Sequence, residues 1–198
     1  MTANRGIDVL KAITAALVLW AGLSAPAQSA VCAGVDLPDT LEREELLVLN
    51  GMGIRIATIF NFHMYVAGLY VPEPQTDPES IIGVDQSRVL VMVFLRDVSQ
   101  RTMRKAIAEA IEVNAADRDM STVIDQLSIV PEVLPEVNEG QALIFDYAPG
   151  YGTAVMLDGE TIANIEGDAF ASALFSLWLG VPANEELKVG LLGGQCEE

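Results

Sequence analysis

The sequence predicts one α+β domain, in which helices lie on one side of a largely antiparallel sheet. Segments with the composition of strands come first and a helical region follows, and this order of strands and then helices occurs a second time. Such a grouped order is typical of α+β domains. Asp158 and Gly159 lie between two strand segments and are a strong signal for a two-residue hairpin, which joins antiparallel strands.

The first group of strands lies in the N-terminal half of the chain. Short strands are predicted at residues 35–37 and 46–50, and the Gly-Met-Gly sequence at 51–53 is predicted to be a turn. A long apolar run follows, and its part at 60–71 is rich in the β-branched and aromatic residues that favour strands. Pro72 ends this strand, because proline cannot donate a hydrogen bond to a neighbouring strand.

Helical signals begin after this strand. Asp77 and Pro78 can cap and start a helical turn, since proline suits the first position of a helix. A buried strand is predicted at 89–95, and Ser99 is predicted to cap a helix that runs to about residue 114. Apolar residues recur along this helix at the helical period: Met103, Ile107, Ala110 and Ile111.

The second half of the chain repeats the order of strands and helices. A helix is predicted at 121–129, and prolines interrupt regular structure at 130–138. The remaining predicted elements are strands at 141–147, 152–157 and 160–165, a helix at 168–179 capped by Asp168, and a helix at 184–191 that ends at Gly193 and Gly194.

The N-terminus has the layout of a cleavable signal peptide. Arg5 and Lys11 give a basic start, an uncharged apolar run occupies 12–23, and small residues follow it. Ala25-Pro26-Ala27 fits the cleavage rule best, so a signal peptide is predicted at 1–27 and one exported domain at 28–198. Cleavage after Ser29 or Ala30 and an uncleaved membrane anchor are the alternatives.

Charge and length exclude some function classes. The chain has 11 basic and 28 acidic residues and a formal net charge of −17, which repels nucleic acid and anionic lipid headgroups. Nucleic acid is therefore not an expected partner. Outside the predicted signal peptide, the apolar segments are shorter than the roughly 20 residues that a membrane helix needs, so no stable membrane span is expected after cleavage.

The two cysteines, Cys32 and Cys196, lie near opposite ends of the predicted domain. In an oxidising compartment they could form one disulfide that joins the ends of the chain. Two free thiols are the alternative, and the sequence leaves both open.

The sequence contains none of the usual catalytic or metal-binding constellations. His63 is the one histidine, so no histidine cluster can bind a metal, and no C-x-x-C sequence occurs. Gly51 and Gly53 do not make a dinucleotide fingerprint, because the third glycine and the following helix are missing. We therefore predict no metal, no cofactor and no catalytic residue.

One candidate binding residue remains. Arg55 lies at the edge of a run that is otherwise poor in charge, and a guanidinium there needs an acidic partner, an exposed position or an anionic ligand. If strand alternation extends back to residue 55, Arg55 shares a face with Asn61, His63 and Tyr65. A guanidinium with a phenol suits a carboxylate or an enolate-like oxygen. A structural ion pair of Arg55 with Asp or Glu is the alternative.

Five segments of the chain resemble those of a known family. The segments at 49–55, 62–71, 93–99, 173–180 and 190–193 read LNGMGIR, FHMYVAGLYV, VFLRDVS, ALFSLWLG and GLLG. Together and in this order they resemble the chalcone isomerase-like family, in its bacterial exported branch. The resemblance implies an open-faced β-sandwich, with a large antiparallel sheet, a helical layer and a ligand cleft between them. It also implies the periplasm as the location.

The family contains enzymes and noncatalytic members. Its plant isomerases close a chalcone into a flavanone without a cofactor, and Arg55 matches their strand arginine. Their strand threonine falls near Tyr65, with a spacing that is about two residues shorter here. Their helical tyrosine and asparagine fall near Arg101 and Ala108, so the chain departs from the enzyme pattern at these positions. In its fatty-acid-binding members an arginine and a tyrosine hold the carboxylate, and Arg55 with Tyr65 resembles that pair better.

These residues and the resemblance are compatible with three functions. The first is a noncatalytic protein that binds a fatty acid or a similar amphipathic anion through Arg55 and Tyr65. The second is an intramolecular lyase of the chalcone isomerase type. The third is a structural or partner-binding envelope protein in which Arg55 forms an ion pair.

Overall fold

The computed structural model describes residues 29–57, 62–117, 119–181, 184–194 and 196. The predicted signal peptide at 1–27 lies outside these residues. The first two residues of the strand predicted at 60–71 also lie outside them.

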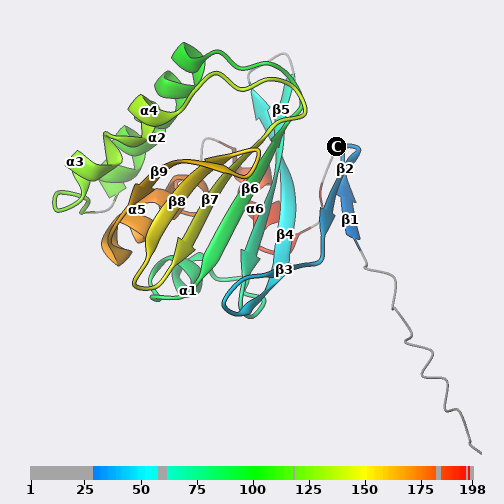
Figure 1. Cartoon of the computed structure of the whole chain (residues 1–198), viewed down its shortest axis with the longest axis horizontal. Helices are drawn as coiled ribbons and strands as arrows, with labels where there is room; N and C mark the ends of the chain where they lie inside the picture. The colour runs from blue at the N-terminus through cyan, green and yellow to red at the C-terminus, as the bar shows by residue number, and fades with distance from the viewer. Residues whose placement is uncertain (1–28, 58–61, 118, 182–183, 195, 197–198) are drawn as a thin grey trace, which may run out of the picture.

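The described residues build a seven-stranded sheet, in which each strand pairs antiparallel with the next one along the chain (Figure 1). Its strands are β3 (Thr40–Glu42), β4 (Leu46–Ala57), β5 (Phe62–Val71), β6 (Arg88–Phe94), β7 (Ala142–Ala148), β8 (Gly152–Leu157) and β9 (Glu160–Ile165). A separate hairpin of β1 (Ser29–Cys32) and β2 (Val35–Pro38) stands beside this sheet at the right of Figure 1.

Helices and the hairpin pack on opposite faces of the sheet. The helices are α1 (Pro78–Ile82), α2 (Gln100–Asp117), α3 (Ile124–Leu127), α4 (Val130–Val133), α5 (Asp168–Leu179) and α6 (Glu185–Leu191). In β5, Ala67 and Leu69 pack with the helices, whereas Val66 and Tyr70 pack with the hairpin, as strand alternation requires. The predicted fold class is thus confirmed: an α+β open-faced sandwich of an antiparallel sheet and a helical layer.

The capping residues explain where several helices begin. The Asp77 carboxylate accepts from the backbone N–H of Glu79 at 3.3 Å, and the Ser99 hydroxyl accepts from that of Thr102 at 3.3 Å. Both caps were predicted, and helix α5 has the predicted bounds. The prediction that Asp168 caps α5 is wrong, because Gly167 occupies that position with a φ of 108°, which glycine adopts readily.

The predicted turn at 51–53 is also wrong, because β4 runs straight through it with one bulge after Leu49. The glycines are there for close packing against α6. A Cβ on Gly51 would lie 2.1 Å from the carbonyl oxygen of Gly190, and one on Gly53 would lie 2.8 Å from that of Leu187. Only residues without a side chain let the helix approach the strand this closely.

The region after α2 differs from the prediction in detail. The single helix expected at 121–129 is two short helices, α3 and α4, and α4 lies in the stretch expected to be irregular. Pro131 is tolerated because it lies in the first turn of α4, where its missing N–H has no helical partner to lose.

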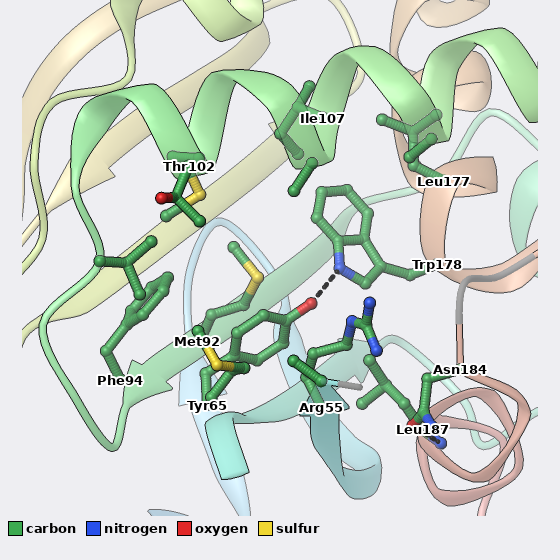
Figure 2. A pocket seen from close by; sticks show the side chains of 16 residues that line it. Arg55, Tyr65, Met92, Phe94, Thr102, Ile107, Leu177, Trp178, Asn184 and Leu187 are labelled. Carbon is green, nitrogen blue, oxygen red and sulfur yellow. Dashed lines mark hydrogen bonds between the residues drawn. The ribbon is translucent and has the colours of Figure 1, made fainter. Parts of the chain in front are cut away.

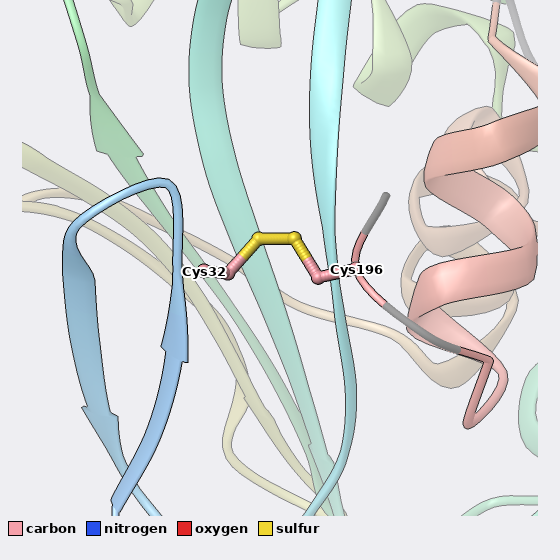
Figure 3. The surroundings of a disulfide bond; sticks show 2 residues. All are labelled: Cys32 and Cys196. Atoms are coloured by element: carbon pink, nitrogen blue, oxygen red, sulfur yellow. A yellow bond between two sulfur atoms is a disulfide. The ribbon is translucent and has the colours of Figure 1, made fainter. Parts of the chain in front are cut away.

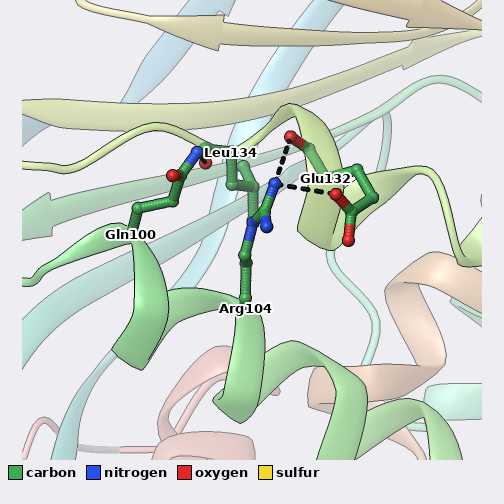
Figure 4. A network of polar contacts seen from close by, with 4 residues as sticks. All are labelled: Gln100, Arg104, Glu132 and Leu134. Atoms are coloured by element: carbon green, nitrogen blue, oxygen red, sulfur yellow. Dashed lines mark hydrogen bonds and ion pairs between the residues drawn. The ribbon is translucent and has the colours of Figure 1, made fainter.

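Polar contacts attach α4 to α2 (Figure 4). The Arg104 guanidinium donates to the Glu132 carboxylate at 2.7 Å and to the Glu132 carbonyl at 3.2 Å. The Gln100 amide donates to the Leu134 carbonyl at 2.9 Å. These contacts hold one side of α2, whose other side faces the sheet.

A disulfide joins Cys32, at the end of β1, to Cys196, which follows α6 (Figure 3). This is one of the two states that the sequence leaves open. Cys32 is buried, and both residues pack with the cluster that includes Leu47 and Met52 of β4. The bond therefore fixes the hairpin and the C-terminal segment to the same part of the sheet.

None of the helices that the structure describes has the length and apolar character needed to cross a membrane.

Loss of the disulfide should lower the free energy of unfolding. The bond spans a sequence separation of 164 residues, and closing a loop of this length is worth about 5 kcal/mol in the chain-entropy model, with about 2–5 kcal/mol measured for native disulfides. Urea denaturation of the oxidised protein with and without reductant will measure the difference.

The double variant Cys32→Ser/Cys196→Ser is the control. It should unfold at the midpoint of the reduced protein and should not respond to reductant. An unchanged midpoint on reduction of the wild type would show that the bond does not stabilise the fold.

Candidate ligand-binding site

A pocket lies between the sheet and the helices, at the ends of β4, β5 and β6 (Figure 2). Its volume is about 160 Å³. The strands contribute Arg55, Ala57, Met64, Tyr65, Met92 and Phe94. The helices contribute Thr102, Met103, Ala106, Ile107 and Ala110 from α2, Leu177 and Trp178 from α5, Leu187 from α6, and Asn184, the residue that caps α6.

The pairing of β4 with β5 brings the two predicted site residues together. Arg55 lies directly opposite Tyr65 in the antiparallel register, and directly opposite residues project from the same face of a sheet. The expected shared face of Arg55 and Tyr65 is therefore present, but it arises across a hairpin and not along one continuous strand.

His63, which was predicted on the same face, does not line the pocket. The register shifts after the Arg55–Tyr65 pair, so that His63 lies opposite Ile56 and Met64 has no partner residue on β4. This bulge lets Met64 and Tyr65, which are neighbours in sequence, both line the pocket.

Arg55 has no acidic partner within the described part of the chain. Its Nη1 donates to the carbonyl oxygen of the next residue, Ile56. The ion pairs found among the described residues are Arg43–Asp146, Arg104–Glu132 and Lys105–Glu109, none of which involves Arg55. The guanidinium lines the pocket and is only partly exposed.

Tyr65 is held by Trp178. The indole Nε1–H of Trp178 donates to the phenol oxygen of Tyr65 at 3.1 Å, and the Tyr65 ring packs on Phe94 with ring centroids 5.4 Å apart. Burial raises the pKa of Tyr65, while the hydrogen bond from Trp178 and the charge of Arg55 lower it by less. Tyr65 is therefore a neutral phenol at physiological pH.

The other polar side chains of the pocket already have partners. The Asn184 oxygen accepts from the backbone of Leu187 at 3.0 Å, and its amide donates to Glu186 at 2.7 Å. The hydroxyl of Thr102 lies 3.0 Å from that of Ser99. Arg55 and Tyr65 thus keep donors for a ligand, at one end of an otherwise largely apolar pocket.

Trp178 was not predicted as a site residue. In the sequence it is one of many apolar residues of the helix 168–179, and no local signal indicates a tyrosine 113 positions earlier as its partner. Met64, Met92 and Leu187 were missed for the same reason, since each reaches the pocket only through the fold.

No group of three or more His, Cys, Asp or Glu side chains in the described residues is arranged to hold a metal ion.

Comparison with known proteins identifies relatives of this fold. Residues 29–193 match the chalcone isomerase-like family. No curated protein is significantly similar to the chain in sequence. The crystal structure of the Arabidopsis thaliana fatty-acid binding protein AtFAP1 is similar with a TM-score of 0.67 and 15% identity, covering 84% of this chain and 96% of that chain. At this identity the likeness shows a shared fold.

The Tyr65 phenol should ionise only above pH 10. Its pKa is raised above the usual value of 10.0, so the unfolded chain releases this proton at lower pH than the folded protein does. The free energy of unfolding of the wild type should therefore fall, relative to that of Tyr65→Phe, as the pH rises through 10.

The absorbance of tyrosinate in the ultraviolet can be followed against pH in the wild type and in Tyr65→Phe. Subtracting one titration from the other leaves the signal of Tyr65 alone. A difference signal that titrates below pH 10 would contradict the buried, neutral phenol.

Proposed function

The chain belongs to the chalcone isomerase-like family, and from this premise we propose that it is an exported, noncatalytic protein that binds a fatty acid or a similar amphipathic anion. The ligand lies in the cleft between the sheet and the helices, with its charged end at Arg55 and Tyr65.

One observation carries this proposal: a guanidinium without an acidic partner in the described residues stands beside a phenol at the end of an apolar pocket. A charge in apolar surroundings is costly unless a counter-charge or hydrogen bonds compensate it. The two oxygens of a carboxylate can accept from Arg55 and Tyr65 together, and hydrogen bonds to charged groups each stabilise by about 1.5–3 kcal/mol.

The pocket suits the first part of an acyl chain. Its volume of about 160 Å³ is close to the roughly 150 Å³ of an engineered cavity that takes benzene, so it encloses on the order of six carbon atoms. Thr102 and Ala106 on α2 line the pocket and are exposed. The end of a longer tail would therefore extend out of the pocket beside Thr102 and Ala106.

The lining residues can adapt to such a tail. Met64, Met92 and Met103 all contact the pocket, and methionine side chains are flexible enough to fill irregular space around different ligands. Each methylene that leaves water contributes about 0.8 kcal/mol. Affinity should therefore rise with chain length until the tail extends beyond the pocket.

Two further facts support binding over catalysis. AtFAP1, which shares the fold, is described as a fatty-acid binding protein. The positions near which the tyrosine and asparagine of plant isomerases fall, Arg101 and Ala108, do not line the pocket. An enzyme of that type would lack those two groups here.

The disulfide supports export. A bond between Cys32 and Cys196 persists in an oxidising compartment and is rare in the cytosol. We therefore propose the periplasm as the location, reached through a signal peptide at 1–27.

Arg55→Ala should abolish retention of the ligand. Native mass spectrometry of gently purified wild type should show a bound fatty acid, and Arg55→Ala should be empty. Titration with dodecanoate should show a Kd raised about 10- to 100-fold, which corresponds to one charge-assisted interaction.

Arg43→Ala is the matched control. It removes the same charge from an exposed arginine that pairs with Asp146 outside the pocket, and it should bind dodecanoate like the wild type. A wild type that is always empty and gains no thermal stability from fatty acids would overturn the proposal. Ring closure of a chalcone at a rate that depends on Arg55 would instead identify an isomerase.

Export should leave a shortened protein. When the whole gene product is expressed in bacteria, the intact mass of the periplasmic fraction should correspond to residues 28–198 with one disulfide. Protein that keeps residues 1–27 and sediments with membranes would indicate an uncleaved anchor.

A further inference from the structure

We propose that Trp178 is a positioning residue that sets the ligand class of this site: by donating to Tyr65 it directs the phenol proton into the pocket. The pair of Arg55 and Tyr65 then presents donors without a free acceptor, and it favours a carboxylate over an alcohol of the same length. This inference rests on the proposed function.

The chemistry of the pair fixes its direction. An indole nitrogen can only donate a hydrogen bond, whereas a phenol oxygen can both donate and accept. In the 3.1 Å contact between Trp178 Nε1 and Tyr65 Oη, the phenol is therefore the acceptor. The hydroxyl proton of Tyr65 remains for another partner.

The position of this proton follows from the phenol itself. Conjugation keeps the O–H bond near the plane of the ring, which leaves two favoured positions for the proton. Because the Trp178 N–H points at the oxygen, the proton takes the position away from the indole. Figure 2 shows the Arg55 guanidinium beside the Tyr65 hydroxyl and the indole nitrogen, at one end of the pocket.

Trp178 is itself held in place. Its side chain is buried near the C-terminal end of α5, and its ring packs on Phe145 with centroids 5.4 Å apart. A buried, packed indole does not turn away easily, so its N–H stays aimed at Tyr65. The donors of Arg55 and Tyr65 are therefore in position before a ligand arrives, which lowers the entropy cost of ordering them on binding.

Arg55 and Tyr65 distinguish a carboxylate from an alcohol by the hydrogen bonds that each ligand can make. A carboxylate brings only acceptors, and these can meet Arg55 and Tyr65 together. An alcohol brings one oxygen and a proton of its own, and this proton finds no acceptor on Arg55, or on Tyr65 while Trp178 donates to the phenol oxygen. Leaving a buried donor without a partner is costly.

Trp178→Phe tests the inference, because it keeps an aromatic ring against Phe145 and removes the N–H. Calorimetric titration of the full protein with dodecanoate and with 1-dodecanol gives two Kd values for each variant. The wild type should prefer dodecanoate at least 10-fold. Trp178→Phe should weaken dodecanoate binding several-fold and reduce this preference.

Tyr65→Phe supplies the second variant, which removes the acceptor in place of the donor. If Trp178 acts through Tyr65, Trp178→Phe should have little further effect on the Kd for dodecanoate when Tyr65 is already Phe. Tyr65→Phe alone should also reduce the preference for dodecanoate, so the test does not depend on Trp178→Phe folding well.

The indole resonance gives an independent readout. The chain has two tryptophans, Trp20 and Trp178, so removal of residues 1–27 would leave one indole N–H signal in a ¹⁵N spectrum. This signal should move on addition of dodecanoate and should shift in Tyr65→Phe, where its acceptor is lost.

The outcomes separate the two proposals. A wild type that binds neither probe removes the proposed function and this inference with it. A wild type that binds dodecanoate while Trp178→Phe keeps the same affinity and preference overturns the inference alone. Equal and additive losses from the two substitutions would also overturn it, because Trp178 would then act without Tyr65.

Discussion

The antiparallel register between β4 and β5 is the constraint on which both the pocket and the core depend. It places Arg55 opposite Tyr65, and it sets Gly51 and Gly53 where α6 can lie against the strand. A slip of one residue would turn every side chain of β4 to the other face. The guanidinium would then leave the pocket, and the glycines would no longer meet α6.

Arg88 is buried and Arg55 is partly buried, but the surroundings of the two guanidinium groups differ. Arg88 is buried, donates to the carbonyl oxygens of Ile81 and Val84 at 2.7 and 2.9 Å, and lies over the rings of Tyr147 and Phe175. Burial lowers the pKa of Arg88 to about 10. Arg88 is therefore surrounded by protein groups, and its role is to stabilise the core. Arg55 instead has an open cavity in front of it, which is why it, and not Arg88, is the candidate for binding.

The sequence predicts the features of this chain that depend on neighbours along it. The bounds of α5 follow from helical periodicity, and the hairpin of Asp158 and Gly159 follows from two residues that accept positive φ, here 50° and 84°. Gly51 and Gly53 gave a wrong prediction of a turn. Glycine occurs both in turns and where a strand packs closely against a helix, and the sequence alone does not distinguish the two. Arg55 was found because charge in an apolar run is unusual, and Tyr65 was found from strand alternation and the family resemblance. Trp178 looks like any core residue until the fold brings it to a phenol.

The bond between Cys32 and Cys196 has a mechanical consequence. A pulling force applied to the two ends of the chain would pass through this one covalent link, because it joins points that are 164 residues apart in sequence. The sheet, the helices and the pocket lie within the closed loop and would carry none of that load. The same closure means that a single cut of the backbone inside the loop would leave the two pieces attached to one another.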